Sequence, residues 1–157
     1  MPIVSRNPST GEIIKQFESY SDECVDKLVL KSYFAHKKLK KISFNKRTVC
    51  MMAVARILNT ESEKLGKILT QEMGKTHTSA IAEIKKSALG AEHYAITAED
   101  YMADDIIKTN ALKSYRSYQP IGPILAVMPW NYPVWQVIRF AAPAIMVILG
   151  TWSFKSG

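Results

Sequence analysis

One asparagine lies between two prolines in the most apolar part of the sequence. In "MPWNYP", Pro129 and Pro133 flank Trp130, Asn131 and Tyr132. An asparagine amide offers two N–H donors and carries no net charge. Fixed beside a dry pocket, such donors can stabilise a developing oxyanion, and losing one can cost roughly 2.7–4 kcal/mol of barrier. The more common interpretation is an asparagine that only caps the following helix, and the residues alone favour that one.

The segments around Asn131 are predicted to form a strand, a five-residue elbow and a helix. Ile124–Met128 is a continuous apolar run with the length of a buried strand. Pro129 cannot donate to a sheet ladder, so the strand should end there, and Pro133 suits the first turn of a helix. Asn131 would then lie at the carboxyl end of a parallel strand, where open α/β sheets bind ligands.

The rest of the chain is predicted to be mainly helical. Apolar spacing, turn residues and caps predict the following elements in order: strands Ile3–Ser5 and Ile13–Phe17, a helix from the Ser21 cap to Leu39, a helix Asn45–Asn59, a helix begun by a Thr60–Glu63 capping box and ended by Gly74, a helix Ser79–Met102 whose alanines permit close packing, and a strand Leu112–Gln119.

Composition limits the class of protein. The 157 residues are 47% hydrophobic and 22% charged, which is typical of one globular domain. The net charge of +7 indicates an anionic partner or a solvated basic face. Cys24 and Cys50, without a secretory leader, favour reduced thiols in the cytoplasm. The longest apolar run, Phe140–Trp152, contains Pro143 and Gly150 and is shorter than a membrane span, so no membrane is expected.

Several segments in series resemble one enzyme family. "PWNYP" followed by "QVIRFAAPAI" is similar to the Pro-Trp-Asn-Phe-Pro signature of the NAD(P)-dependent aldehyde dehydrogenases. "NPSTGE", "LTQEMGKT" and "YQPIGPILAVMPWN" resemble further segments of that family, in the same order. The resemblance covers about residues 3–146. Within the family, "MPWNYPVWQVIRFAAPAIM" looks most like the succinate-semialdehyde dehydrogenase branch.

This resemblance implies a fold, a reaction and roles for individual residues. The implied fold is α/β, a partial Rossmann-like cofactor domain with a helix-rich N-terminal portion. Asn131 would be catalytic, binding the oxyanion while an aldehyde is oxidised to an acid with NAD or NADP. Met128, Pro129, Trp130 and Asn131 would line the cofactor, and Lys155 would imitate a ribose-binding lysine. Complete relatives would be cytoplasmic homo-oligomers that act on a small aldehyde.

The helix after the elbow predicts a substrate-binding face. Tyr132, Gln136 and Arg139 follow one another at steps of four and three residues, which places them on one helical face. An arginine in so apolar a helix needs an anionic partner, because burying its charge unpaired is costly. The partner is either a substrate carboxylate, as the resemblance implies, or an internal salt bridge.

The sequence also departs from the family. No residue matches the catalytic cysteine or glutamate, and Cys24 and Cys50 lie in early predicted helices as packing cysteines. Residues of about 147–157 do not follow the family pattern, and a frameshift is one hypothesis for this aberrant tail. We therefore expect residues 1–157 to be an incomplete N-terminal part of the aldehyde dehydrogenase domain, inactive alone.

A different class of function remains open as an alternative. The run "HKKLKK", His36–Lys41, could belong to a non-enzymatic basic helical module that binds an anionic partner such as nucleic acid. No aromatic residues interleave with it, and lysines also suit the end of a helix, so nucleic acid is not expected. His77 and His93 have no zinc-site spacing, so no metal is expected, and Gly74–Thr76 lacks the first glycine of a phosphate loop.

Overall fold

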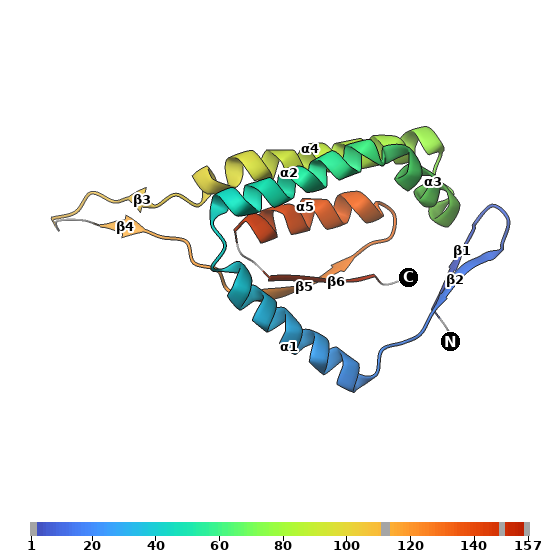
Figure 1. The fold of residues 1–157 in the computed structure, drawn as a ribbon, viewed down its shortest axis with the longest axis horizontal. Coiled ribbons are helices and arrows are strands. Elements are labelled where there is room, and N and C mark those ends of the chain that lie inside the picture. The colour runs from blue at the N-terminus through green and yellow to red at the C-terminus, as the bar shows by residue number, and fades with distance from the viewer. Residues whose placement is uncertain (1–2, 111–113, 148–149, 156–157) are drawn as a thin grey trace.

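The chain forms a group of helices beside a short parallel sheet (Figure 1). The fold is that of a computed structural model, which describes residues 3–110, 114–147 and 150–155. Its helices are α1 (Asp22–Leu39), α2 (Phe44–Thr60), α3 (Ser62–Met73), α4 (His77–Tyr101) and α5 (Pro133–Met146). Its strands are β1 (Ile3–Arg6), β2 (Ile13–Phe17), β3 (Asp105–Ile106), β4 (Tyr115–Arg116), β5 (Pro123–Met128) and β6 (Gly150–Lys155).

Helix α4 is the central element, because it packs against α2, α3 and α5. The predicted alanine stripe is the reason, since small side chains let the neighbouring helices approach closely. Gly90 adds to this, because a Cβ at that position would lie 3.0 Å from Cζ3 of Trp135 on α5. The buried core combines Ile84 and the alanines of α4 with side chains of α2, α3 and α5: Met51, Ala55, Leu58, Leu69, Ala80, Ile84, Ala88, Ala91, Ala95, Ala98, Ala142 and Met146.

The layers lie in the order helices, sheet, helix. Figure 1 shows α2 and α4 side by side, α5 between them and the β5–β6 sheet, and α1 on the opposite side of that sheet. The strands β1 and β2 form a separate antiparallel hairpin, as does the pair β3 and β4. Among the described residues, no helix is both long enough and apolar enough to cross a bilayer.

Most helix boundaries agree with the sequence prediction to within two residues. The hydroxyl of Ser21 accepts a hydrogen bond from the amide of Cys24 at 3.3 Å, which confirms the predicted cap of α1. Gly74 ends α3 in the left-handed conformation, with φ of 70°, as predicted.

The predicted capping box at Thr60 and Glu63 is wrong. Thr60 is the last residue of α2, and its hydroxyl donates to the carbonyl of Arg56 at 3.0 Å instead of capping α3. Glu61 joins the two helices directly, and its side chain makes no cap hydrogen bond. A threonine hydroxyl can donate a hydrogen bond to a carbonyl in the preceding turn of its own helix. The local sequence pattern is therefore compatible both with the last residue of one helix and with the cap of the next.

Two strand predictions also need correction. The predicted strand Leu112–Gln119 is paired only at Tyr115 and Arg116, and residues 111–113 lie outside the described part of the chain. The strand β5 is real, but it is not buried on both faces, because Leu125 and Val127 are 65% and 66% exposed. Among the described residues its only strand neighbour is β6; Ala126 is its one buried residue, and Ile124 and Met128 are half-buried.

Candidate functional site

The predicted strand, elbow and helix are confirmed. The strand β5 ends at Met128 and helix α5 begins at Pro133, so the connection between them carries Trp130 and Asn131. Both side chains are exposed, and Trp130 is 67% accessible to solvent. Pro133 lacks an N–H and has a fixed φ, which suits its place at the first helical position.

Asn131 does not cap the helix that follows it. The N-cap residue of α5 is Tyr132, and its side chain makes no cap hydrogen bond. The first two amides of α5, those of Val134 and Trp135, donate instead to a side chain of α4. The capping interpretation of Asn131 is therefore wrong, and within the described residues no hydrogen bond occupies its amide.

The predicted cofactor residues lie along one edge of the parallel sheet. The strands β5 and β6 run parallel in a continuous register from Pro123 opposite Gly150 to Met128 opposite Lys155. The carboxyl ends of both strands are therefore adjacent, and Pro129 and Trp130 continue from this edge. Strand pairing brings the backbone of Lys155 beside that of Met128.

Two of the three residues predicted to bind substrate from α5 are in contact with each other. A guanidinium N–H of Arg139 donates to Oε1 of Gln136 at 3.0 Å, so these two side chains share a face. The ring of Tyr132 contacts Nζ of Lys75, which lies 3.7 Å from the ring centroid. Arg139 is exposed, and the residues that the structure describes give it no ion pair, which removes the support for an internal salt bridge.

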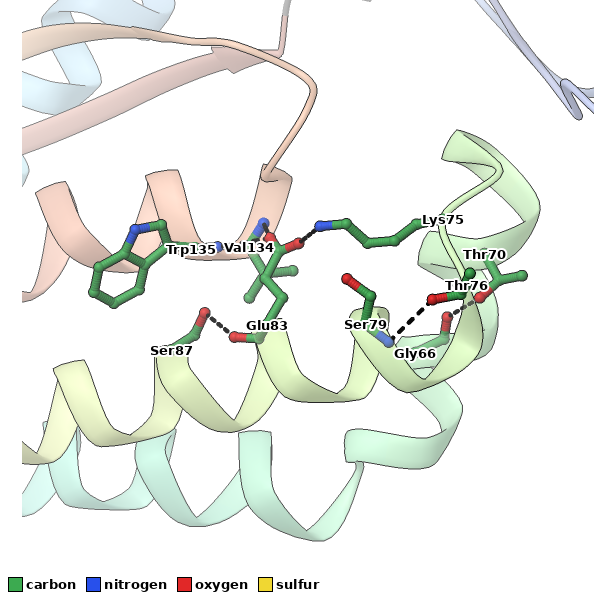
Figure 2. A network of polar contacts seen from close by, with 9 residues as sticks. All are labelled: Gly66, Thr70, Lys75, Thr76, Ser79, Glu83, Ser87, Val134 and Trp135. Carbon is green, nitrogen blue, oxygen red and sulfur yellow. Dashed lines mark hydrogen bonds and ion pairs between the residues drawn. The ribbon is translucent and has the colours of Figure 1, made fainter.

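The most heavily bonded residue near the elbow is one that the sequence analysis did not select. Figure 2 shows Glu83 of α4 directed toward the first turn of α5. Its Oε1 accepts from the amides of Val134 and Trp135, each at 3.1 Å, and its Oε2 lies 2.5 Å from Nζ of Lys75. The Glu83 side chain is 1% exposed, so this carboxylate is fully desolvated and fully paired.

A signal for Glu83 is present in the sequence. Glu83 lies three residues after Ala80 and four before Ser87, and both of these are fully buried. The helical period therefore places a carboxylate on the buried face of α4, where an acid needs a partner. The partner is Lys75 of "EMGKT", a segment in which the sequence analysis excluded a nucleotide site without assigning another role.

The opposite end of α5 is held by a second buried charge. Arg47 of α2 donates from Nη1 to the carbonyl oxygen of Met146 in the last turn of α5. Its guanidinium also stacks on Phe44, with Cζ 4.0 Å from the ring centroid. Burial lowers the pKa of Arg47, and the negative charge of Glu99 opposes that shift.

Comparison with known protein families identifies the family to which the chain belongs. Residues 1–148 match the aldehyde dehydrogenase family, which is nearly the whole chain. The chain belongs to the aldehyde dehydrogenase family. This confirms the resemblance drawn from the elbow and the three other segments.

The aldehyde dehydrogenases most similar to this chain include succinate-semialdehyde dehydrogenases. "Succinate-semialdehyde dehydrogenase [NADP(+)] 1" of Mycobacterium tuberculosis is 43% identical over 149 residues, which are 93% of this chain and 33% of the relative. A similar protein of Mycobacterium avium is 43% identical over 154 residues. The solved succinic semialdehyde dehydrogenase of Streptococcus pyogenes, in complex with NADP+, has a TM-score of 0.88 at 30% identity and covers 96% of this chain. The chain spans about a third of the length of the curated relatives it matches.

The two thiols of this aldehyde dehydrogenase chain lie on α1 and α2, and not on β5, α5 or the connection between them. Cys24 is half-buried on α1, and Cys50 is exposed on α2. The prediction that both are packing cysteines is therefore wrong for Cys50, because its position on the helix faces outward. In the described ranges, no group of three or more His, Cys, Asp and Glu side chains could hold a metal ion.

The basic run of the chain lies at a helix end. His36, Lys37 and Lys38 occupy the last turn of α1, where positive charge complements the helix dipole. Lys37 also stacks on Tyr33, with Nζ 4.5 Å from the ring centroid. These contacts give the run a local role in the helix.

Proposed function

We propose that this chain supplies the oxyanion-binding elbow and part of the cofactor edge of an NADP-dependent succinate-semialdehyde dehydrogenase. One observation carries the proposal: the exposed amide of Asn131 stands at the carboxyl end of β5, while Glu83 satisfies the adjacent helix terminus. An asparagine freed from capping has both N–H donors available to a ligand. The sequence similarity to succinate-semialdehyde dehydrogenases supports the choice of substrate.

Asn131 would act on charge that develops during the reaction. When a thiolate adds to an aldehyde, the carbonyl oxygen becomes an oxyanion, and a fixed N–H donor stabilises it more than it stabilises the aldehyde. Cys24 and Cys50 lie on α1 and α2, and neither matches the catalytic cysteine of the family, so the proposal assigns the thiolate to residues other than these two. We therefore expect the 157-residue chain alone to be inactive.

The edge formed by β5 and β6 fits a dinucleotide cofactor of Rossmann-like domains. Met128, Pro129, Trp130 and Lys155 would hold NAD or NADP there, and the exposed Trp130 would offer an aromatic surface to it. When bound, the nicotinamide accepts the hydride from the substrate carbon. The proposal includes a cytoplasmic homo-oligomer as the complete protein, with a small aldehyde as its partner and no nucleic acid.

The test of the elbow uses a chimera. Residues 1–147 of this chain replace the matching segment of the Mycobacterium tuberculosis relative, and oxidation of succinic semialdehyde is followed by NADP reduction. We expect Asn131→Ala to lower kcat by roughly 10²- to 10³-fold, because an oxyanion donor is lost. Asn59→Ala, which removes an exposed amide from α2, is the matched control. An equal kcat for both variants contradicts the proposed role of Asn131, and the 157-residue chain serves as the blank.

The same chimera tests substrate recognition by Arg139. The exposed guanidinium, oriented by Gln136, presents a planar fork suited to a substrate carboxylate. We expect Arg139→Ala to reduce kcat/KM for succinic semialdehyde by roughly 10- to 100-fold, the worth of a charged hydrogen bond. An uncharged aldehyde of similar length should be affected far less, and Arg56→Ala on α2 should affect neither. Equal losses for both aldehydes would rule out carboxylate recognition.

A further inference from the structure

The end of the elbow that leads into α5 is fixed from another helix. Val134 and Trp135 occupy the second and third positions of α5, where amides have no partner within the helix. Both donate to Oε1 of Glu83, which lies more than 50 residues earlier in the chain. One buried carboxylate therefore satisfies both amides and complements the positive end of the helix dipole.

Lys75 connects this carboxylate to the elbow itself. Its side chain is 13% exposed, and its Nζ pairs with Glu83 at 2.5 Å. The same Nζ lies 3.7 Å from the ring centroid of Tyr132, the residue that directly follows Asn131. Figure 2 shows Lys75 reaching from the connection between α3 and α4 toward Glu83 and the start of α5. One cation thus contacts both the fixed carboxylate and the neighbour of Asn131.

Little of the chain separates these contacts from the Asn131 amide. Only Tyr132 and Pro133 lie between Asn131 and the anchored amide of Val134, and the proline ring fixes one of the intervening torsions. On the other side, Pro129 follows β5, whose last residue pairs in register with Lys155. Because no described residue hydrogen-bonds to the Asn131 side chain, its direction depends on how these two flanks are held.

We infer that Glu83 and Lys75 are positioning residues that set the direction of the Asn131 amide through the first turn of α5. This inference rests on the proposed function of Asn131 as an oxyanion donor. The two residues touch neither substrate nor cofactor in this role. They act by holding Tyr132, Val134 and Trp135, so that the amide is already oriented before charge develops on the substrate.

Substitutions that keep the shape of the network separate this role from general packing. Glu83→Gln preserves the side-chain volume and one acceptor oxygen. It removes the negative charge and replaces the other oxygen with an NH2 donor. Lys75→Met keeps an apolar chain of similar length and removes the cation. Lys75→Arg keeps the positive charge, and an arginine side chain can contact both a carboxylate and an aromatic ring, so it is the conservative variant.

Nuclear magnetic resonance of the labelled 157-residue chain is the first measurement. In Glu83→Gln and in Lys75→Met, we expect amide exchange at Val134 and Trp135 to accelerate at least about tenfold. The order parameter of Asn131 should fall from about 0.85 to below about 0.6. Lys75→Arg should retain the original values, as should Glu63→Gln, which neutralises an exposed acid that does not contact α5. Faster exchange at Val134 with an unchanged Asn131 overturns the inference, because Glu83 would then be a helix cap alone.

A kinetic cycle in the chimera provides a second measurement. Glu83→Gln should lower kcat at least about tenfold, with the KM for NADP changed less than about twofold. In the Asn131→Ala background, the same substitution should cost less than about threefold, because its effect passes through the amide already removed. A full tenfold loss in that background overturns the inference. If Asn131→Ala alone leaves kcat unchanged, the proposed function fails, and the order parameter of Asn131 still decides whether Glu83 positions the elbow.

Discussion

The two ends of helix α5 are each held by a buried charge from another helix, but in the described part of the chain only one of the two, Glu83, forms an ion pair. At the first turn, the carboxylate of Glu83 is paired with Lys75. At the last turn, the guanidinium of Arg47 donates to the carbonyl of Met146. Both charges have the sign that complements the helix dipole at their end.

The difference concerns how completely each charge is satisfied. Glu83 uses both oxygens, on two amides and one ammonium group. Among the described residues Arg47 has no carboxylate within ion-pair distance, and its Nε has no hydrogen-bond partner. Burial accordingly lowers the pKa of Arg47, with Glu99 opposing this shift from a distance. The end that carries the elbow is thus fixed by several bonds, and the far end by packing and one donor.

The largest effect should follow from breaking the paired end. Glu83→Ala leaves the largely buried ammonium of Lys75 without its carboxylate and leaves the amides of Val134 and Trp135 without their acceptor. We expect a loss of about 3–5 kcal/mol in the free energy of unfolding, as for other broken buried pairs. Urea denaturation of the 157-residue chain, followed by circular dichroism, measures it.

The matched control for this prediction is an exposed acid. Glu63 pairs with His77 at 3.0 Å, but its side chain is largely exposed. Glu63→Ala should therefore cost about 0–1 kcal/mol, because water screens such pairs. Similar losses for the two alanine variants would show that the buried network adds nothing to stability.

Breaking the unpaired end should have a smaller effect. Arg47→Met keeps an apolar side chain against Phe44, removes the desolvated charge and loses the bond to Met146. We expect a loss of about 1.5–3 kcal/mol, the range for a hydrogen bond to a charged group. The measurement is again the urea midpoint.

Combining the two substitutions tests whether the ends are independent. The 14 residues of α5 place its ends about 20 Å apart at 1.5 Å per residue. Energies at such a separation usually add to within about 0.5 kcal/mol. A large departure from additivity in Glu83→Ala with Arg47→Met would instead indicate that α5 transmits strain between its ends.

The features that the sequence predicted correctly are those whose signals are local. The strand, elbow and helix around Asn131 were predicted because each signal lies within a few residues: an apolar run and two prolines. Ser21 and Gly74 were predicted for the same reason. The prediction for Thr60 was wrong because its hydroxyl can form a hydrogen bond either at the end of α2 or as a cap of α3.

Contacts over long separations were not predicted. Glu83 meets Val134 across 51 residues, and Arg47 meets Met146 across 99. No local pattern specifies such partners, and a charged residue on a mainly apolar helix face indicates only that a partner must exist. The proximity of Lys155 to Met128 has the same origin, since strand register sets it and sequence spacing does not.

The smallest effect on stability is expected at an exposed ion pair, in contrast with the two buried charges at the ends of α5. On the β3–β4 hairpin, Asp105 accepts hydrogen bonds from Arg116 at 2.7 Å and from Tyr118 at 3.1 Å. These bonds, chiefly that from Arg116, lower the pKa of Asp105. A carboxyl group whose pKa is lower in the folded state stabilises it fully above the unfolded pKa of about 3.9, and that contribution is lost as the pH falls through the folded value.

We therefore expect the hairpin to be insensitive to pH above about pH 5 and to loosen only below about pH 4. The amide resonances of Ile106 and Arg116, which lie in the paired strands, report this transition during an acid titration. Asp105→Asn should remove the transition, whereas Asp104→Asn, which changes an adjacent exposed acid, should leave it. Salt at roughly 1 M should weaken the pair, because exposed charges are screened over about 3 Å under that condition. A transition that survives Asp105→Asn would assign the acid sensitivity of the hairpin to another carboxylate.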